Sequence, residues 1–218
     1  MDAPSPASAP RSRPPPFKKP WFWLLLIGAL ASTGVLIRGV TDRMLRPPPV
    51  LVTLPAFAFT NQRGEPFGSQ QLEGKVWIAN FIFTRCPSIC PRFTGEMRRV
   101  QEKTQATKPP IQLVSFSVDP AYDQPPVLAE YAQRHQADPR RWSFLTGAPE
   151  QVKGTVMEGF KVVLGGGDGG ADDPDNIFHG THFVLVDDAL QVRGYYRSDD
   201  PVAVKNLIRD ARILSRRR

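Results

Sequence analysis

Two apolar runs dominate the hydrophobic pattern of this chain of 218 residues, and they differ in length and setting. The first, residues 21–37, contains 17 residues without a charge, whereas the second, residues 76–83, is a short continuous run. A run close to 20 residues is typical of a membrane-spanning helix, and a short run predicts a strand buried on both faces. The pattern therefore predicts a membrane anchor followed by an α/β domain.

The anchor is predicted from its flanks as well as from its length. Residues 1–20 are rich in Pro, Ala and Ser, which predicts a disordered leader. Trp21 and Trp23 open the apolar run, where aromatic side chains prefer the membrane interface. Basic residues in the leader predict a cytoplasmic N-terminus, so the C-terminal part of the chain is expected across the membrane.

Two alternatives to an anchor remain open. A cleaved secretory signal is disfavoured by the length of the run and by the lack of an A-x-A cleavage site, and a buried core helix by Gly28 and Gly34. Residues 38–49 end in three consecutive prolines, which predicts a stiff linker. The folded domain is then expected over residues 50–215.

Apolar spacing in that domain alternates between the strand and the helix period. Further strands are expected over residues 111–118, 143–145, 181–186 and 191–196. Helices are expected over residues 93–107, 126–136, 149–162 and 201–214. Strands alternating with helices, then a hairpin and a helix, are the order of a thioredoxin-like domain, an α/β fold with a central mixed sheet flanked by helices.

The positive charge of the chain lies at its ends. The formal net charge is +7, but residues 1–47 carry +5 of it and the last three arginines carry +3. Residues 48–215 are therefore close to neutral, at −1. A near-neutral body offers no basic groove, so we expect no nucleic-acid partner.

Both cysteines of the chain stand in one short segment, from Cys86 to Cys90, directly after the buried strand 76–83. Sites in α/β sheets form at the carboxyl ends of strands, and a following helix N-terminus favours the thiolate. Two thiolates are soft ligands that suit Cu(I) or zinc. The spacing is wider than the usual C-x-x-C, and Pro91 predicts an irregular, exposed loop that can bind a metal or close into a disulfide. Two unrelated structural cysteines are the alternative.

Three histidines could add a nitrogen ligand. His135 lies among polar residues in a predicted helix and is expected in solvent. His179 follows a Gly/Asp-rich loop, and His182 lies in the next predicted strand. A mobile loop before His179 would let this side chain reach the cysteines and complete a trigonal site of two sulfurs and one nitrogen. On the residues alone, both His179 and His182 remain candidates.

Several segments around these residues resemble the Sco/SenC family of membrane-anchored copper-binding proteins. The similarity covers residues 50–215, and the matching pieces are TRCPSICP at 84–91, SVDP at 117–120, LAEYA at 128–132 and HGT at 179–181. The resemblance implies a thioredoxin-like fold and one copper ion per chain, held by Cys86, Cys90 and His179. It makes His182 a strand residue.

Two further positions bear on the site through this resemblance. The family often has an acidic residue where this chain has Ser88, so the charge near the thiolates differs here. Asp119 and Asp123 match the family's DP-x-x-D segment. These two carboxylates are expected either to order the cysteine loop or to serve as capping and turn residues.

The resemblance implies a metallochaperone that delivers copper to the dinuclear copper site of a respiratory cytochrome oxidase. The implied partners are the copper-site subunit of the oxidase, other copper chaperones and thiol reductases. The implied location is the bacterial inner membrane, with a single span and the C-terminal domain in the periplasm.

Two alternatives use the same thiols. In the first, Cys86 and Cys90 are the redox-active thiols of a thiol–disulfide oxidoreductase that keeps the client's copper-binding cysteines reduced. In the second, the chain is a peroxide-reducing or sensory protein, in which Arg85 or Arg92 activates a cysteine of low pKa. The metallochaperone reading involves no enzyme activity.

Overall fold

The computed structural model describes residues 20–44, 46–86, 89–162 and 181–216. The chain divides into two units, Met1–Arg46 and Pro47–Arg218. The predicted leader lies outside the described residues, apart from Pro20, which begins the first helix.

In the first unit the described residues form α1 (Pro20–Met44), a helix of 25 residues that includes the predicted anchor. Leu24, Leu30 and Leu36 are among its exposed apolar side chains. In the part of the chain that the structure describes, no helix combines the length and the hydropathy that crossing a membrane requires.

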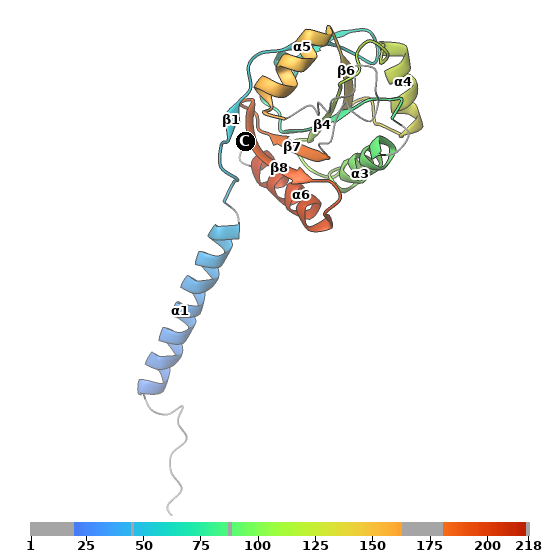
Figure 1. The fold of residues 1–218 in the computed structure, drawn as a ribbon. Helices are drawn as coiled ribbons and strands as arrows, with labels where there is room; N and C mark the ends of the chain where they lie inside the picture. Colours follow the sequence, from blue (N-terminus) through green and yellow to red (C-terminus); the bar gives the residue numbers. More distant parts are fainter. Residues whose placement is uncertain (1–19, 45, 87–88, 163–180, 217–218) are drawn as a thin grey trace, which may run out of the picture. The chain divides into compact units, whose positions relative to one another are not determined.

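The second unit is built on a mixed sheet of eight strands among the described residues, in the order β1-β8-β7-β4-β5-β6-β2-β3 (Figure 1). The central strands β4, β5 and β6 are mutually parallel, and the other pairings are antiparallel. The strands are β1 (Val52–Thr53), β2 (Ala58–Asn61), β3 (Pro66–Gly68), β4 (Trp77–Ile82), β5 (Gln112–Ser117), β6 (Trp142–Thr146), β7 (His182–Val186) and β8 (Gln191–Arg197). We call the edge at which β4, β5 and β6 end the carboxyl edge.

Helices cover both faces of this sheet (Figure 1). One face carries α3 (Ile89–Lys103), α4 (Pro125–Arg134) and α6 (Pro201–Ser215). The other carries α2 (Ser69–Leu72) and α5 (Pro149–Gly154), which continues as the π-helix η2 (Thr155–Gly159). The expected α/β class, with a mixed sheet between helices, is confirmed.

The continuous apolar run of β4 is explained by its position at the centre of the sheet. Ile78 and Ile82 point into the core beneath α3, α4 and α6, whereas Trp77, Ala79 and Phe81 point into the opposite core. All six residues of β4 are buried, because successive side chains alternate between two covered faces. Single-faced alternation is therefore absent from this strand.

The predicted elements after residue 76 are present, with shifted ends. The predicted strands 76–83, 111–118 and 143–145 correspond to β4, β5 and β6, and the predicted hairpin to β7 and β8. The predicted helix over 149–162 is instead α5 followed by η2. A π-helical turn carries one extra residue per turn, which periodicity within a short helix does not reveal.

The segment before β4 adds three strands and a short helix that the apolar pattern does not predict. These elements have two to four residues each, too few for a period to show. The side chain of Gln62 joins this segment to β6, because its Nε2 donates to the Trp142 carbonyl (3.2 Å) and its Oε1 accepts from the Phe144 N–H (2.9 Å).

Candidate metal and redox site

The two cysteines lie together at the carboxyl edge of the sheet. β4 ends at Ile82, and Cys86 follows in a turn in which its N–H donates to the Phe83 carbonyl at 3.3 Å. The backbone N–H of Cys90 donates to Cys86 Sγ at 3.5 Å. The two cysteines are not joined in a disulfide. The described residues thus place two cysteine sulfurs at one end of the sheet, as predicted.

The local structure differs from the irregular, exposed loop that the sequence predicts. α3 begins at Ile89, so Pro91 falls in the first helical turn, where its missing N–H costs no hydrogen bond. Cys86 and Cys90 are only 7% and 2% exposed, because Phe83 and Val118 pack against them. The prediction of exposure is therefore wrong, and the helix places a backbone donor against the first sulfur.

The protonated thiol is the favoured form of Cys90. Burial, together with the nearby Cys86 and Asp123, raises the pKa of this thiol to about 12. A peroxide-reducing cysteine needs a stable thiolate, so this environment disfavours Cys90 in that role. A metal ion can still bind, because it takes the place of the proton.

Asp123 ties the ends of β4 and β5 together next to the cysteines. Its carboxylate is fully buried and accepts from the Thr84 N–H (3.1 Å), the Thr84 hydroxyl (2.5 Å) and the Ser117 hydroxyl (2.5 Å). Burial raises the pKa of Asp123, while the hydrogen bonds from Ser117 and Thr84 oppose that shift. Because Thr84 stands two residues before Cys86, this network orders the start of the cysteine segment, which was one of the two roles expected for the aspartates.

Arg85 is held on the same edge by two contacts. Its Nε donates to the Asp119 carboxylate at 2.5 Å, and its guanidinium lies 5.4 Å from the centre of the Tyr122 ring. Asp119 is nearly buried, whereas Tyr122 is half-exposed. An arginine paired with a carboxylate is a weak activator of a thiolate, which further disfavours the peroxide alternative.

Thr84 and Ser117 are site residues that the sequence reasoning missed. Each is a hydroxyl residue at or just beyond the end of a buried strand, and those two strands are adjacent and parallel. Polar residues in this position, followed by a buried aspartate, are the signal that could have found them.

β7 begins at the edge at which β4 ends. The antiparallel register pairs Trp77 with Val186 and Ala79 with Val184, so the start of β7 lies toward the cysteines. His182 is the first residue of β7 and half-buried, as expected of a strand residue.

His179 and Ser88 lie outside the described residues. Within the described residues, no three side chains of His, Cys, Asp or Glu are grouped so that they could hold a metal ion. The structure thus brings together two of the three predicted ligands, and the third stays a prediction.

His135 is less exposed than the sequence predicts. Its ring lies against Tyr131, with 4.4 Å between the ring centres, and burial lowers its pKa, as do Arg134 and Arg98. Tyr131 is buried and its hydroxyl is 2.7 Å from that of Thr94. The expectation of a solvated side chain is wrong because α4 turns this residue toward its own aromatic neighbour.

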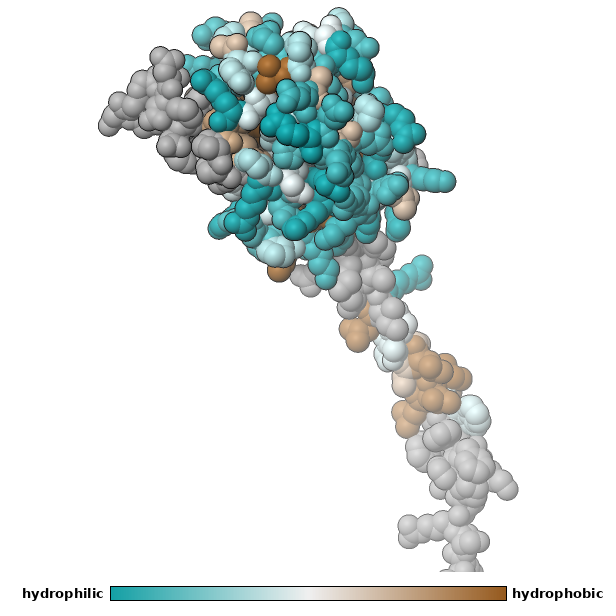
Figure 2. Space-filling view, turned by 90° about the vertical axis from the view of Figure 1, so that its right-hand side faces the viewer, coloured by the Kyte–Doolittle hydropathy of each residue, from teal (hydrophilic) through white to brown (hydrophobic). Residues whose placement is uncertain are grey.

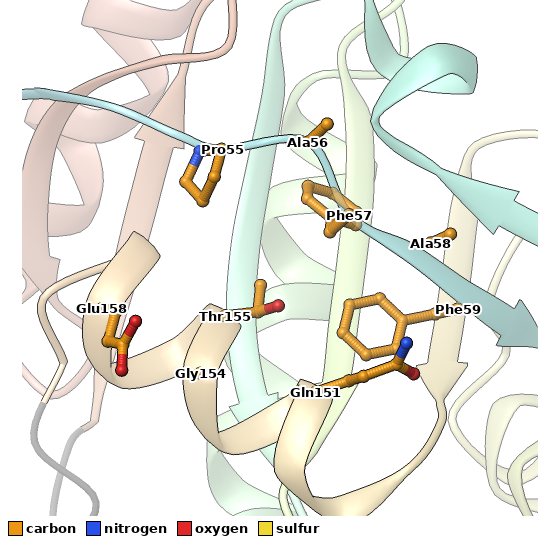
Figure 3. Close-up of a pocket in the computed structure, with 9 residues that line it drawn as sticks. All are labelled: Pro55, Ala56, Phe57, Ala58, Phe59, Gln151, Gly154, Thr155 and Glu158. Atoms are coloured by element: carbon orange, nitrogen blue, oxygen red, sulfur yellow. The ribbon is translucent and has the colours of Figure 1, made fainter.

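A separate pocket of about 290 Å³ opens between the segment before β2 and the helices α5 and η2 (Figure 3). The rings of Phe57 and Phe59 line one side, and Gln151, Thr155 and Glu158 line the other. The lining includes neither cysteine, so this pocket is distinct from the predicted site.

Comparison with known proteins identifies relatives of the whole second unit. The SCO1/SenC family model matches residues 49–212. A SCO1/SenC family lipoprotein from Bacillus anthracis is 35% identical, with a TM-score of 0.68 over 75% of this chain and 95% of that chain. A candidate copper-binding protein of Stutzerimonas stutzeri is 35% identical over 135 residues, which are 59% of this chain and 65% of the relative.

A further solved structure is that of BsSco, described as a member of the Sco family of cytochrome c oxidase assembly proteins in which a disulfide switch was identified. It is 30% identical, with a TM-score of 0.69 over 79% of this chain and 98% of that chain. This likeness confirms the thioredoxin-like arrangement predicted for the domain. The chain belongs to the SCO1/SenC family.

Proposed function

We propose that this chain is a copper-binding assembly factor of a respiratory cytochrome oxidase, which holds one copper ion through Cys86, Cys90 and His179. The observation that carries the proposal is that two cysteine sulfurs lie side by side at the carboxyl edge, where the Cys90 N–H donates to Cys86 Sγ at 3.5 Å. Relatives described as copper-binding and as cytochrome c oxidase assembly proteins support the metal and the process.

The donor set favours copper over a structural zinc ion. Thiolate sulfur is a soft ligand that suits Cu(I), and a buried, apolar site stabilises a low-coordinate ion. Structural zinc sites almost always have four protein ligands, whereas this one offers three. Phe83 and Val118 supply the apolar shell around the sulfurs.

The strand order supports His179 as the third ligand. β7 starts at His182 on the edge that carries the cysteines, and His179 precedes it by three residues. Three residues of extended chain span at most roughly 10 Å, a reach that is compatible with the proposed role of His179.

Delivery requires a site that an ion can enter and leave. When Cu(I) binds, the thiols of Cys86 and Cys90 each release a proton, and both take up protons again when the ion passes to thiolates of the client. No electron moves in this exchange. A three-ligand site leaves room for an incoming client ligand, so the ion is never released to solvent. The proposed client is the copper-site subunit of the oxidase.

Thiol–disulfide exchange is the second candidate function, favoured by the disulfide switch identified in BsSco. Oxidation of Cys86 and Cys90 to a disulfide would release two protons and two electrons, which would reduce a client disulfide to two thiols. A Cys90→Ser chain would then trap a mixed disulfide through Cys86 with a client peptide. This role is contradicted if no such adduct forms and if the reduction potential of the Cys86–Cys90 pair is too high to reduce the client disulfide.

We also propose that residues 21–37 of α1 anchor the chain in the bacterial inner membrane, with the leader 1–20 in the cytoplasm, the linker 38–49 beyond the span and the domain 50–215 in the periplasm. The exposed apolar side chains of α1 and the lipoprotein relative support membrane attachment. Extraction of bacterial membranes with alkaline carbonate should leave the full chain in the membrane fraction. Full release into the supernatant contradicts the anchor.

Copper titration of the full chain tests the main proposal. The reduced chain should bind one Cu(I), and the oxidised chain should bind none tightly. Cys86→Ser, Cys90→Ser and His179→Ala should each weaken binding by at least about tenfold, whereas His135→Ala serves as the matched histidine control. Unchanged copper binding by Cys86→Ser or His179→Ala refutes the proposed site.

A further inference from the structure

The outer surfaces of α3 and α6 carry a concentration of positive charge that the proposed copper site does not use. Eight exposed or half-exposed cations lie on these helices and on the cap of α6: Arg92, Arg98, Arg99, Lys103, Lys205, Arg209, Arg212 and Arg216. The same described helices carry three acidic residues, Glu96, Glu102 and Asp210. We call this surface the basic face. It stands out because residues 48–215 as a whole are near neutral, at −1.

The basic face is continuous. α3 and α6 contact each other along the same side of the sheet, and the Arg212 guanidinium donates to the Lys103 carbonyl at 2.5 Å. The side of the domain on which α3 and α4 lie is mostly hydrophilic (Figure 2). A shallow hollow of about 600 Å³ on α3 is lined by Arg92, Gly95 and Arg99 together with the neighbouring charged residues of the helix.

The acidic residues reduce the positive charge of this face without cancelling it. Arg99 pairs with Glu96, and Arg98 pairs with Glu102, but all four side chains remain partly exposed to solvent. Exposed pairs of this kind are weak, so these arginines can exchange partners.

The carboxylates of α6 and of the loop before it have partners of their own. Asp210 pairs with Arg209, Asp199 pairs with Arg197, and Asp200 accepts from the Val202 N–H as the helix cap. Arg197 and, more weakly, Arg92 lower the pKa of Asp199, so this carboxylate faces the basic face as well. The eight cations still outnumber the five carboxylates Glu96, Glu102, Asp199, Asp200 and Asp210.

The basic face begins at the end of α3 that carries Cys90. Arg92 is exposed and stands two residues after Cys90 in the first turns of α3, and Arg99 follows two turns later on the same side of the helix. A protein that receives copper must bring its own ligands to the end of α3 at which Cys90 lies. Cations that begin at this end and continue along the helix therefore favour a protein partner.

We infer that the basic face is the docking surface for an acidic surface of the protein that accepts copper. This inference rests on the proposed function, because it names the charge of the proposed client. Complementary charge steers the encounter and orients the partner, which raises the association rate more than the final affinity. The ion would pass between thiolates at the edge of that contact, with the proton balance given above.

Copper transfer to two synthetic acceptor peptides tests the inference. Both peptides carry the same two cysteines and one histidine, and they differ only in flanking residues, which are glutamates in one and lysines in the other. The full chain, loaded with Cu(I) in micelles of a neutral detergent, should transfer copper to the acidic peptide about tenfold faster at low salt. The difference should disappear near 1 M salt, where the Debye length is about 3 Å.

Paired charge reversals test whether the basic face causes the preference for the acidic peptide. Arg92→Glu with Arg99→Glu should abolish or invert the preference for the acidic peptide. The control, Lys75→Glu with Lys153→Glu, makes the same change in net charge at exposed positions outside α3 and α6 and should leave the preference intact. Neither variant alters a proposed ligand, and copper affinity is measured for each variant so that a change in binding is distinguished from a change in docking.

Three results would overturn the inference. The first is an equal transfer rate to both peptides at low salt, and the second is a preference that survives the arginine reversals. The third is slow transfer only from micelles doped with anionic phosphatidylglycerol, relieved by the same reversals, which would assign the face to a membrane surface. A wild-type chain that takes up no Cu(I) is a different failure, because it refutes the proposed function and the docking surface with it.

Discussion

Replacement of Asp123 by asparagine tests whether the cysteine segment is held in place by a buried carboxylate. In the wild-type domain this carboxylate accepts from the Thr84 N–H, the Thr84 hydroxyl and the Ser117 hydroxyl. The variant has nearly the same shape. It keeps one carbonyl oxygen and presents an NH₂ group where the second carboxylate oxygen was, so a donor faces a donor.

The expected loss of stability follows from these bonds. A hydrogen bond to a charged group contributes about 1.5–3 kcal/mol, and the amide loses about one such bond and weakens another. Part of the loss is offset, because the burial cost of the carboxylate charge disappears with it. We therefore expect the free energy of unfolding to fall by about 2–3 kcal/mol, which for a domain of this size lowers Tm by about 4–12 °C.

The assay is urea unfolding of residues 47–218, a compact unit, followed through the fluorescence of the buried Trp77 and Trp142. Glu158→Gln removes one carboxylate charge at an exposed position and should change stability by less than about 0.5 kcal/mol. Copper affinity should fall in the Asp123 variant, because Thr84 is released. A variant as stable as the Glu158 control would refute the reasoning.

Four further substitutions probe the fold. Because burial lowers the pKa of His135, the unfolded chain binds a proton at a higher pH than the folded chain, and the free energy of unfolding should decline as pH falls through about 6.5. His135→Gln should reduce the difference in this free energy between pH 7.5 and pH 5.5, measured by urea unfolding. An unchanged difference contradicts the lowered pKa of His135. Gly95→Ala should raise the free energy of unfolding by about 1 kcal/mol, because a Cβ at this position of α3 meets open space. Gly68→Ala should destabilise the domain strongly, because a Cβ would lie 2.1 Å from the Phe57 carbonyl oxygen. Similar effects of the two substitutions would contradict the packing described at these two glycines. Gln62→Ala should cost about 1–3 kcal/mol in urea unfolding, since the backbone of β6 loses two partners, and a cost near zero would mean that water replaces them.

The elements that could be predicted from the sequence are those with a long or doubly buried pattern. β4 and β5 have apolar runs because both of their faces are covered, and α6 has 15 residues over which the helical period is clear. The strands β1 to β3 have two to four residues. β1 pairs with β8 and β2 with β6, which lie far away in the sequence, whereas β3 pairs with the neighbouring β2. Local periodicity carries no information about such contacts.

The candidate site was predictable in its residues but not in its surroundings. The strand before Cys86 and the C-x₃-C spacing indicate two thiols at the carboxyl edge. The burial of Cys90 was not predictable, because Pro91 suggested a loop and a proline in the first turn of a helix gives the same local sequence. The Asp123 network joins residues 39 positions apart, so it depends on the alignment of β4 with β5.

X-ray absorption spectroscopy of the Cu(I)-loaded full chain tests the central claim most directly. The account predicts a first coordination shell of two sulfurs and one nitrogen in the wild-type chain. His179→Ala should lose the nitrogen and keep both sulfurs, whereas His135→Ala should leave the shell unchanged. A shell without sulfur, or a wild-type nitrogen that persists in His179→Ala, would contradict a copper site made of Cys86, Cys90 and His179.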